Sequence, residues 1–182
     1  MPTPRIRKDN PQAIYFATCT VIGWIDIFTR SPYFDILADS IRYSQKHKGL
    51  LLYGYVFMTN HIHLLFSTGD GHRPEDFLRD FKKWTTKEIA RELEQDPRHW
   101  VRNLLANTSL KKEQNKNQIW QQGNYPETVE TDSFFLEKLN YMHMNPVRKG
   151  YVVAHKDWKY SSARNWECGD QSVVSVITEG LL

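Results

Sequence analysis

The clearest pattern in the chain runs from residue 50 to residue 67, which reads LLLYGYVFMTNHIHLLFS. Residues 50–57 form a continuous apolar run of strand length, which is typical of a strand in the middle of a sheet. Residues 58–60 break this run, and residues 61–67 resume with the alternation of a second strand. The side chains expected to face the core are Ile62, Leu64 and Phe66. Two strands joined by a tight turn predict a β-hairpin.

The second strand carries two histidines on its other side. Because side chains alternate along a strand, His61 and His63 should point the same way, together with Leu65. Imidazole binds several divalent metals, and two imidazoles need a third ligand to complete a site. Nothing nearby in the sequence resembles a closed zinc site, so an open, catalytic site fits better. A His-x-His pair also arises by chance on strands, with one ring merely hydrogen-bonded, and the pair alone does not choose between these interpretations.

A second motif, YMHMNPVR, occupies residues 141–148. On a helix, residues four apart share a face, so the phenol of Tyr141 and the amide of Asn145 would be neighbours. The residue before a proline avoids the α region, so Asn145 is expected at the end of that helix rather than inside it. Two imidazoles and an amide oxygen around a metal, with a phenol one turn away, suit attack on a phosphodiester. The alternative is an ordinary core tyrosine with its hydroxyl at the rim.

Two other side chains compete for these roles. His143 is two residues from Tyr141 and would point elsewhere on a helix, so Asn145 is the better third ligand. Tyr125 is a rival nucleophile, but Pro126 follows it, so it is expected in a loop with a less fixed direction.

Upstream of the hairpin, the pattern predicts a strand and a helix. Residues 15–28 are rich in aromatic and β-branched side chains, which favour a strand, with Gly23 at a bulge or bend. A helix is expected over residues 31–48, with Ser31 as its N-cap, and it should stop at Gly49.

Downstream of the hairpin, residues 75–95 predict an amphipathic helix, and residues 132–133 are expected to cap another. Residues 96–118 are expected to form an insertion loop, residues 1–12 a flexible arm, and residues 173–177 a short strand. The order strand, helix, strand, strand, helix is an incomplete ferredoxin-like pattern.

Composition bounds the class of protein. With 182 residues, 40% hydrophobic and 13% aromatic, the chain is expected to form one globular domain over residues 1–182. A net charge of +3 and a pI near 8.8 mildly favour an anionic partner. Cys19 and Cys168 match no metal spacing, which favours a reduced, cytosolic compartment. Neither a signal peptide nor an apolar run of about 18 residues is evident.

Basic side chains interleaved with aromatic ones form a third signal. A charged helix face is often only solvated surface, and this interpretation stays open. Nucleic acid is favoured where such a face lies beside Trp84, Trp120 and Tyr125, on which unpaired bases could stack. The candidates for DNA contact are Arg79, Lys82, Lys83, Trp84, Lys87, Arg148 and Lys149.

Together these motifs resemble the single-tyrosine HUH transposases, especially the REP-associated tyrosine transposases and related insertion-sequence enzymes. Residues 60–64, NHIHL, are similar to the HUH strand of that family, and residues 139–150, LNYMHMNPVRKG, to its tyrosine helix. Residues 80–85 and 158–164 are supporting segments, and the resemblance spans residues 15–166.

The resemblance implies an α+β fold, a ferredoxin-like sandwich whose antiparallel sheet has helices packed on it. It implies Tyr141 as the nucleophile, and His61, His63 and Asn145 as ligands of Mg²⁺ or Mn²⁺. The reaction implied is cleavage and rejoining of single-stranded DNA at hairpin-associated sites through a 5′-phosphotyrosine. The partner implied is a hairpin-forming DNA repeat, bound by a monomer or a homodimer at the nucleoid of a bacterial cytoplasm.

Three alternatives stay open at this point. One is a replication initiator or relaxase-like nickase, which cuts and religates without transposing. Another is a domesticated protein that binds DNA hairpins without turnover. The third is a metal-dependent RNA-processing enzyme of ferredoxin-like fold.

Overall fold

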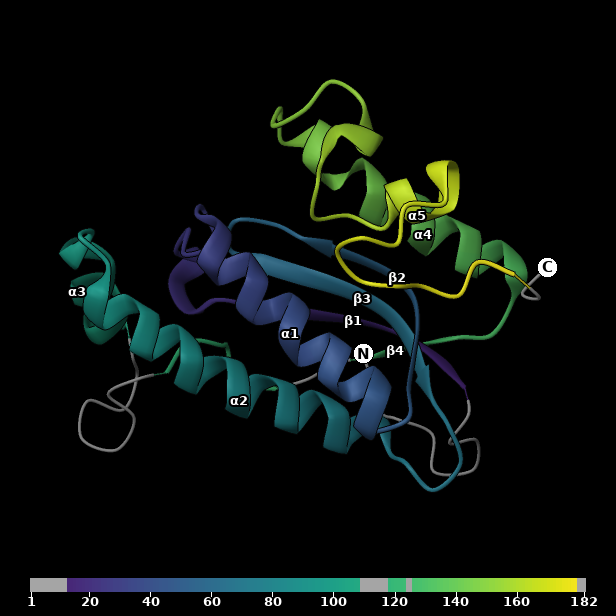
Figure 1. The fold of residues 1–182 in the computed structure, drawn as a ribbon, viewed down its shortest axis with the longest axis horizontal. Coiled ribbons are helices and arrows are strands. Elements are labelled where there is room, and N and C mark those ends of the chain that lie inside the picture. The colour runs from purple at the N-terminus through teal and green to yellow at the C-terminus, as the bar shows by residue number, and fades with distance from the viewer. Residues whose placement is uncertain (1–12, 109–117, 124–125, 180–182) are drawn as a thin grey trace, which may run out of the picture.

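A four-stranded antiparallel sheet with the spatial order β2-β3-β1-β4 forms the centre of the protein (Figure 1). The computed structural model describes residues 13–108, 118–123 and 126–179. The strands are β1 (Ile14–Thr20), β2 (Leu50–Phe57), β3 (His61–Thr68) and β4 (Glu127–Val129). The helices are η1 (Ile22–Trp24), α1 (Ser31–His47), α2 (Pro74–Gln95), α3 (His99–Thr108), α4 (Asp132–Arg148), η2 (His155–Asp157) and α5 (Ala163–Cys168).

The strand and helix order confirms the predicted α+β ferredoxin-like sandwich. The short strand β4 pairs with β1 and completes the pattern that the sequence left unfinished. Its three residues, Glu127–Val129, carry too little alternation to be recognised as a strand before its partner is known. Among the described helices, none has the length and apolarity needed to cross a membrane.

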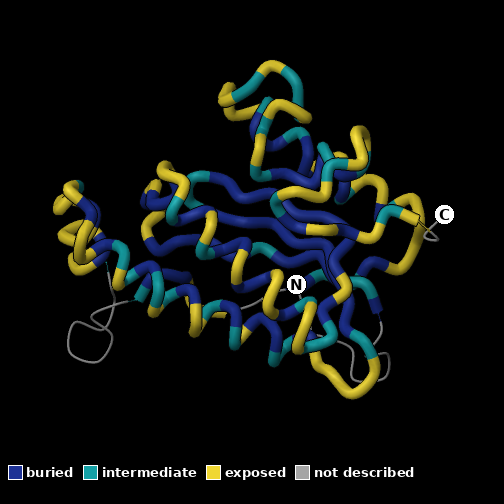
Figure 2. The backbone as a smooth tube through the Cα atoms, viewed as in Figure 1, coloured by how far each residue is buried: buried dark blue, intermediate teal, exposed yellow. Residues whose placement is uncertain are grey.

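Helices cover both faces of the sheet, so β3 is buried along its whole length and most of β1 and β2 is buried with it (Figure 2). The predicted hairpin of β2 and β3 is confirmed, with Ile62, Leu64 and Phe66 in the larger core beneath α1 and α2. On the opposite face, Leu65 lies in a second core with Met142 of α4. The α4 face of the sheet is therefore a second interior, although the alternation indicated only one.

Gly54 allows α4 to lie close to the sheet. A Cβ atom on this residue would lie 2.7 Å from Cε of Met142 and 2.9 Å from Cδ1 of Leu139. Both distances are shorter than real carbon contacts. The missing side chain in β2 thus sets the height of the helix that carries Tyr141.

The first predicted strand is too long. β1 ends at Thr20, and the chain then bends through η1, where Gly23 has a φ of 64°, as the predicted bend requires. Residues 25–28 are buried except Asp26, but they form no strand. Aromatic and β-branched side chains report burial as much as strand geometry, which explains the error.

Helix boundaries differ from the predictions by small amounts. α1 begins at Ser31 with Arg30 at the N-cap position and no side-chain cap. The side chain of Thr131 caps α4 by accepting from the backbone N–H of Phe134 at 3.2 Å, in place of residues 132–133.

The prediction that α4 ends near Asn145 is wrong, because the helix continues through Pro146 to Arg148. A proline near the last turn removes only one ladder hydrogen bond, and Pro146 is buried against its surroundings. Tyr141 and Asn145 therefore do share one face of an intact helix.

The predicted insertion loop at residues 96–118 is also partly wrong. Residues 99–108 form α3, whose buried Val101 and Leu105 are four residues apart on one face. Residues 109–117, and the predicted arm at residues 1–12, lie outside the described part of the chain. The predicted strand at residues 173–177 is absent from the described chain; that segment makes a backbone hydrogen bond from Ile177 N to Leu52 O at 2.8 Å.

Candidate functional site

The two histidines of β3 lie side by side on the face of the sheet that α4 covers. Their ring centroids are 4.9 Å apart, and the side chains of His61 and His63 are only 6% and 5% exposed. His63 also stacks on Phe16 of β1, with centroids 5.3 Å apart and planes at 20°. The period of the strand and the second core together hold both rings in one direction.

Hydrogen bonds to one nitrogen of each ring orient the other nitrogen. Asn60 Oδ1 lies 2.7 Å from Nδ1 of His61 and can only accept, so that Nδ1 carries the proton and Nε2 keeps a lone pair. Thr18 Oγ1 lies 2.8 Å from Nδ1 of His63. Nε2 of His63 is buried and has no hydrogen-bond partner. A buried polar atom without a partner is costly in a native protein and indicates a site for a ligand.

Asn60 is itself held in place. Its amide nitrogen donates to Asp26 Oδ1 at 2.9 Å and to the carbonyl oxygen of Trp24 at 3.2 Å. These two bonds identify which end of the amide faces His61. The arrangement is the outer-shell support that metal-binding histidines usually have.

Burial keeps both histidines neutral. Desolvation lowers the pKa of His61 to about 4, with Lys149 contributing, and that of His63 to about 3, with His61 and Lys138 contributing. A neutral imidazole has the free lone pair that a metal ligand needs.

Tyr141 is beside this pair and open to solvent. Its ring centroid is 5.4 Å from that of His63, and the residue is 40% exposed. The guanidinium carbon of Arg148 lies 5.4 Å from the centre of the Tyr141 ring. A phenol that can reach an incoming substrate thus stands between the histidines and a cation.

Asn145 lies one helical turn after Tyr141 and is buried. Its amide nitrogen donates to the carbonyl oxygen of Tyr141 at 3.3 Å, which leaves the amide oxygen outside that bond. His143 points elsewhere, as its position predicts: its Nε2 lies 2.9 Å from Ser162 Oγ, and its ring stacks with that of His155.

The donor set fits a divalent cation in an open site. Within the described residues, no group of three or more His, Cys, Asp or Glu side chains comes together. Two neutral imidazoles, one with an orphaned nitrogen, leave positions for an amide oxygen and for substrate oxygens. The role of Asn145 as third ligand stays a prediction.

The candidate DNA contacts divide between two places. Arg148 and Lys149 are exposed at the end of α4, close to Tyr141, whereas Arg79, Lys83, Trp84 and Lys87 are exposed on α2. Because α2 packs on the opposite face of the sheet, its basic side chains are separated from the histidines by the sheet itself.

Two of the predicted contacts are satisfied inside the protein. Lys82 donates to the carbonyl oxygens of Gln121 at 3.2 Å and Gly123 at 2.9 Å. The prediction that Trp120 offers a stacking surface is wrong, because it is buried and its Nε1 donates to Thr85 Oγ1 at 2.9 Å. Tyr125 lies outside the described residues.

Sequence reasoning missed the supports of the histidines. Thr18 faces His63 across the β1–β3 pairing, which becomes visible only when the register is known. Asp26 and Trp24 were assigned to a strand, and their place next to Asn60 follows from the bend at Gly23. A glycine followed directly by an aromatic residue was the available signal.

A ferredoxin-like domain with a His-x-His strand beside a helical tyrosine is the arrangement of an HUH-type tyrosine transposase. The family model for IS200-like transposases matches residues 26–143, more than half of the chain, and the chain belongs to this family. His61, His63 and Tyr141 fall within the matched residues, whereas Asn145 and Arg148 follow them. The predicted family is confirmed.

One relative resembles the chain in sequence over part of its length, and one solved structure resembles it in fold over nearly all of it. It is 27% identical over 105 residues to a Haemophilus influenzae protein named as a REP-associated tyrosine transposase. That alignment covers 58% of this chain and 54% of the relative, so the chain spans about half the length of the relative it matches. A solved structure of a REP-associated tyrosine transposase bound to a REP hairpin matches with a TM-score of 0.69 at 18% identity. This second match covers 97% of this chain and 99% of the other, and it shows the shared fold.

Proposed function

We propose that this chain cleaves and rejoins single-stranded DNA at hairpin-associated sites, with Tyr141 as the nucleophile. One observation carries the proposal: Nε2 of His63 is buried without a partner, next to an exposed helical phenol. The large majority of buried side-chain polar atoms in native proteins have a hydrogen-bond partner, so an orphaned ring nitrogen supports a place for an ion or another ligand. A phenol positioned beside a ligand-binding nitrogen is what covalent attack on a phosphodiester needs.

The metal proposed is Mg²⁺ or Mn²⁺, held by Nε2 of His61, Nε2 of His63 and the amide oxygen of Asn145. When bound, such a cation supplies Lewis-acid polarisation of a phosphate oxygen and offsets the negative charge of the transition state. Thr18 and Asn60 keep the two rings in the orientation that presents Nε2.

The chemical step proposed is an exchange of phosphodiester bonds. The Tyr141 oxygen bonds to phosphorus, the bond from phosphorus to the 3′-oxygen breaks, and the product is a 5′-phosphotyrosine with a free 3′-hydroxyl. The phenol proton passes to water and the 3′-oxygen takes up a proton, so the step balances in atoms and charge with no further reactant. Arg148, over the Tyr141 ring, stabilises the negative charge that develops on the phenolic oxygen. Rejoining is the reverse attack by a 3′-hydroxyl.

The partner proposed is a hairpin-forming DNA repeat. The solved structural neighbour is bound to a REP hairpin, and we extend that class of partner to this chain. The exposed cations Arg148, which lies over the Tyr141 ring, and Lys149, which follows it in the chain, suit phosphate groups. The proposal allows either a single copy or a homodimer as the active form.

The test is a gel assay for a covalent protein–DNA adduct. The protein is incubated with single-stranded hairpin oligonucleotides that carry flanking sequence, with Mg²⁺, with Mn²⁺ or with chelator, beside Tyr141→Phe. We expect a metal-dependent, denaturant-resistant band that Tyr141→Phe abolishes while hairpin binding persists. An adduct that persists in Tyr141→Phe but not in Tyr125→Phe would identify Tyr125 as the nucleophile instead.

Other outcomes select among the remaining functions. Tight hairpin binding with no adduct under any metal would favour a non-catalytic binder. Adduct formation without strand transfer between two DNA ends would favour a nickase. Cleavage of RNA hairpins in preference to DNA would favour an RNA-processing enzyme.

A further inference from the structure

Trp24 has a backbone conformation that is costly for its side chain. Its φ is +55°, and among the described residues it is the one non-glycine residue with a positive φ. Bulky residues rarely occupy this region, and such strain concentrates at functional sites. The bend is firmly held, because the neighbouring Ile22 and Ile25 are both buried and the carbonyl oxygen of Trp24 accepts from Asn60.

The strained backbone presents a large aromatic ring to solvent beside the candidate site. Trp24 is 57% exposed, and its ring meets that of His61 edge-on, with centroids 5.6 Å apart. Four rings thus form a contiguous row, in the order Trp24, His61, His63, Tyr141, with successive centroid separations of 5.6, 4.9 and 5.4 Å. The indole stands at one end of this row and the proposed nucleophile at the other.

We propose that Trp24 is a stacking platform for one unpaired nucleobase close to the cleaved phosphodiester. This inference rests on the proposed function and names a substrate-binding residue within it. An exposed indole on a rigid backbone offers a flat face with little rotational entropy to lose, and every base has a π-face to match it. Lys149, whose positive charge acts on His61, is a cation available for the phosphate of that nucleotide.

The same features argue against a structural role for the indole. A core tryptophan buries its ring and usually donates its N–H to a partner. Trp120 does both here, and the partly buried Trp158 and Trp166 donate to backbone carbonyls. Trp24 does neither among the described residues: more than half of it is exposed, and its hydrogen bonds are those of its backbone, whose N–H donates to Val21 O at 3.1 Å and whose carbonyl accepts from Asn60. Replacing the side chain therefore leaves that bond to Asn60 in place.

The experiment measures the binding of fluorescent single-stranded hairpin DNA by anisotropy, in a Tyr141→Phe background that prevents cleavage. One oligonucleotide is intact, and each of the others has one abasic position near the cleavage site. We expect Trp24→Ala to weaken binding of the intact DNA about tenfold and Trp24→Phe to restore most of it. At one position, removal of the base should weaken DNA binding by the protein that retains Trp24. The same removal should cause little further loss of affinity in Trp24→Ala, since both changes remove the same contact.

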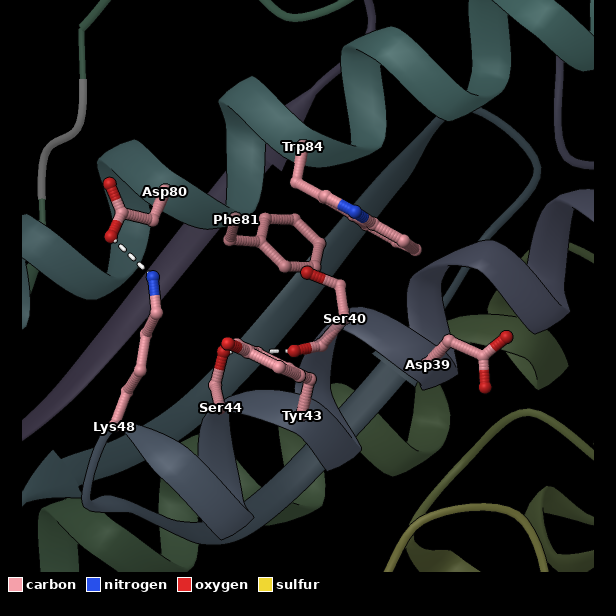
Figure 3. A pocket seen from close by; sticks show the side chains of 8 residues that line it. All are labelled: Asp39, Ser40, Tyr43, Ser44, Lys48, Asp80, Phe81 and Trp84. Atoms are coloured by element: carbon pink, nitrogen blue, oxygen red, sulfur yellow. Dashed lines mark hydrogen bonds and ion pairs between the residues drawn. The ribbon is translucent and has the colours of Figure 1, made fainter.

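Tyr43 provides a matched control. It is also 57% exposed, but it lies on α1, where it lines a pocket with Trp84 on the opposite face of the sheet (Figure 3). Tyr43→Ala should leave the affinity for every oligonucleotide unchanged. An equal loss in Tyr43→Ala and Trp24→Ala, or a Trp24→Ala loss that adds fully to every abasic change, would overturn the stacking proposal.

Thermal unfolding separates binding from folding. Glycine adopts a positive φ without strain, so Trp24→Gly should unfold at or above the temperature of the parent protein while binding DNA weakly. A lower unfolding temperature would make the indole a structural element and overturn the proposal.

The adduct assay keeps the two proposals distinct. An adduct in the unmodified protein, with unchanged DNA affinity in Trp24→Ala, refutes only the stacking role. Absence of any adduct, with binding that depends on Trp24 and on one base, refutes only the catalytic function.

Discussion

The two faces of the sheet differ in how completely their buried and charged groups are paired. On the face beneath α1 and α2, charged groups are paired within the protein: Lys48 with Asp80 at 2.5 Å and Arg42 with Asp39 at 2.5 Å, both beside the pocket of Figure 3. On the face beneath α4, one buried nitrogen has no partner and one tryptophan has a strained backbone. Both faces contain a hydrophobic core, and the orphaned nitrogen and the strained tryptophan support the proposal that the α4 face also binds a ligand.

The largest expected effect is that of replacing His63. His63→Leu should abolish metal-dependent adduct formation with little net change in the free energy of unfolding, because it removes a buried nitrogen that lacks a partner but also leaves the Thr18 hydroxyl without its bond to Nδ1. Adduct yield and urea denaturation, measured on the same preparation, test both halves. Unchanged cleavage would remove this residue from the site, and a marked loss of stability would make it structural.

A large effect on stability alone is expected on the other face. Asp96 is fully buried, accepts from the Tyr33 hydroxyl at 2.5 Å and pairs with Arg98 at 2.7 Å. Asp96→Asn removes one partner of a buried charged pair, so it should cost about 3 kcal/mol of stability. The adduct yield per folded molecule should not change, since this cluster ties α1 to the chain after α2, and both helices pack on the face of the sheet opposite α4.

The same variant gives a pH dependence of known sign. The hydrogen bonds from Arg98, and then that from Tyr33, hold the pKa of Asp96 well below its usual range. A depressed pKa in the folded state means that the stabilisation is complete above the unfolded pKa of about 3.9 and is lost as the pH falls toward the folded value. The stability gap between parent and Asp96→Asn should therefore be constant from pH 7 to pH 5 and narrow below about pH 4. Urea denaturation at these pH values tests it, and a gap that widens on acidification would contradict it.

A smaller effect is expected from filling the space at Gly54, where α4 lies close to the sheet. Gly54→Ala places a methyl group against Met142 and Leu139, so α4 must rise from the sheet. We expect about a tenfold loss of adduct rate and about 1 kcal/mol of destabilisation. A small displacement of the nucleophile lowers the reaction rate more than it lowers the stability of the fold. Gly69→Ala is the control, since its nearest neighbour would be 3.7 Å away. Equal rates in both variants would show that the height of α4 does not matter.

The sequence predicted the hairpin and the tyrosine helix well because their patterns are local. His61 and His63 share a side through the period of a strand, and Tyr141 and Asn145 share a side through the period of a helix. The family resemblance added the expectation that strand and helix meet, which periodicity alone could not supply. The structure places His63 and Tyr141 in contact.

What the sequence could not predict depends on contacts between distant residues. Trp120 was expected to be exposed because aromatic residues near a basic helix suggest stacking, but it fills the space between Phe28 and Phe81. The strained conformation of Trp24 follows from buried anchors on both sides of a bend and from the amide of Asn60. No local pattern records either arrangement, since each depends on register and packing.

The smallest expected effect compares the cations of the two faces. Within the described residues, Arg148 and Lys149 form no ion pair, whereas Arg79 is paired with Asp76 and Asp80. Free cations beside the phenol should contact phosphate, so Lys149→Ala should weaken DNA binding a few-fold and reduce the slope of log affinity against log salt by about 0.7, the value for one single-strand contact. Lys83 on α2 is exposed and was itself a candidate DNA contact from the sequence, so Lys83→Ala is the comparison and should leave the slope unchanged if DNA is confined to the α4 face. An equal reduction in both variants would mean that the DNA wraps around the edge of the sheet to α2, and the proposal that the α4 face alone binds DNA would fail.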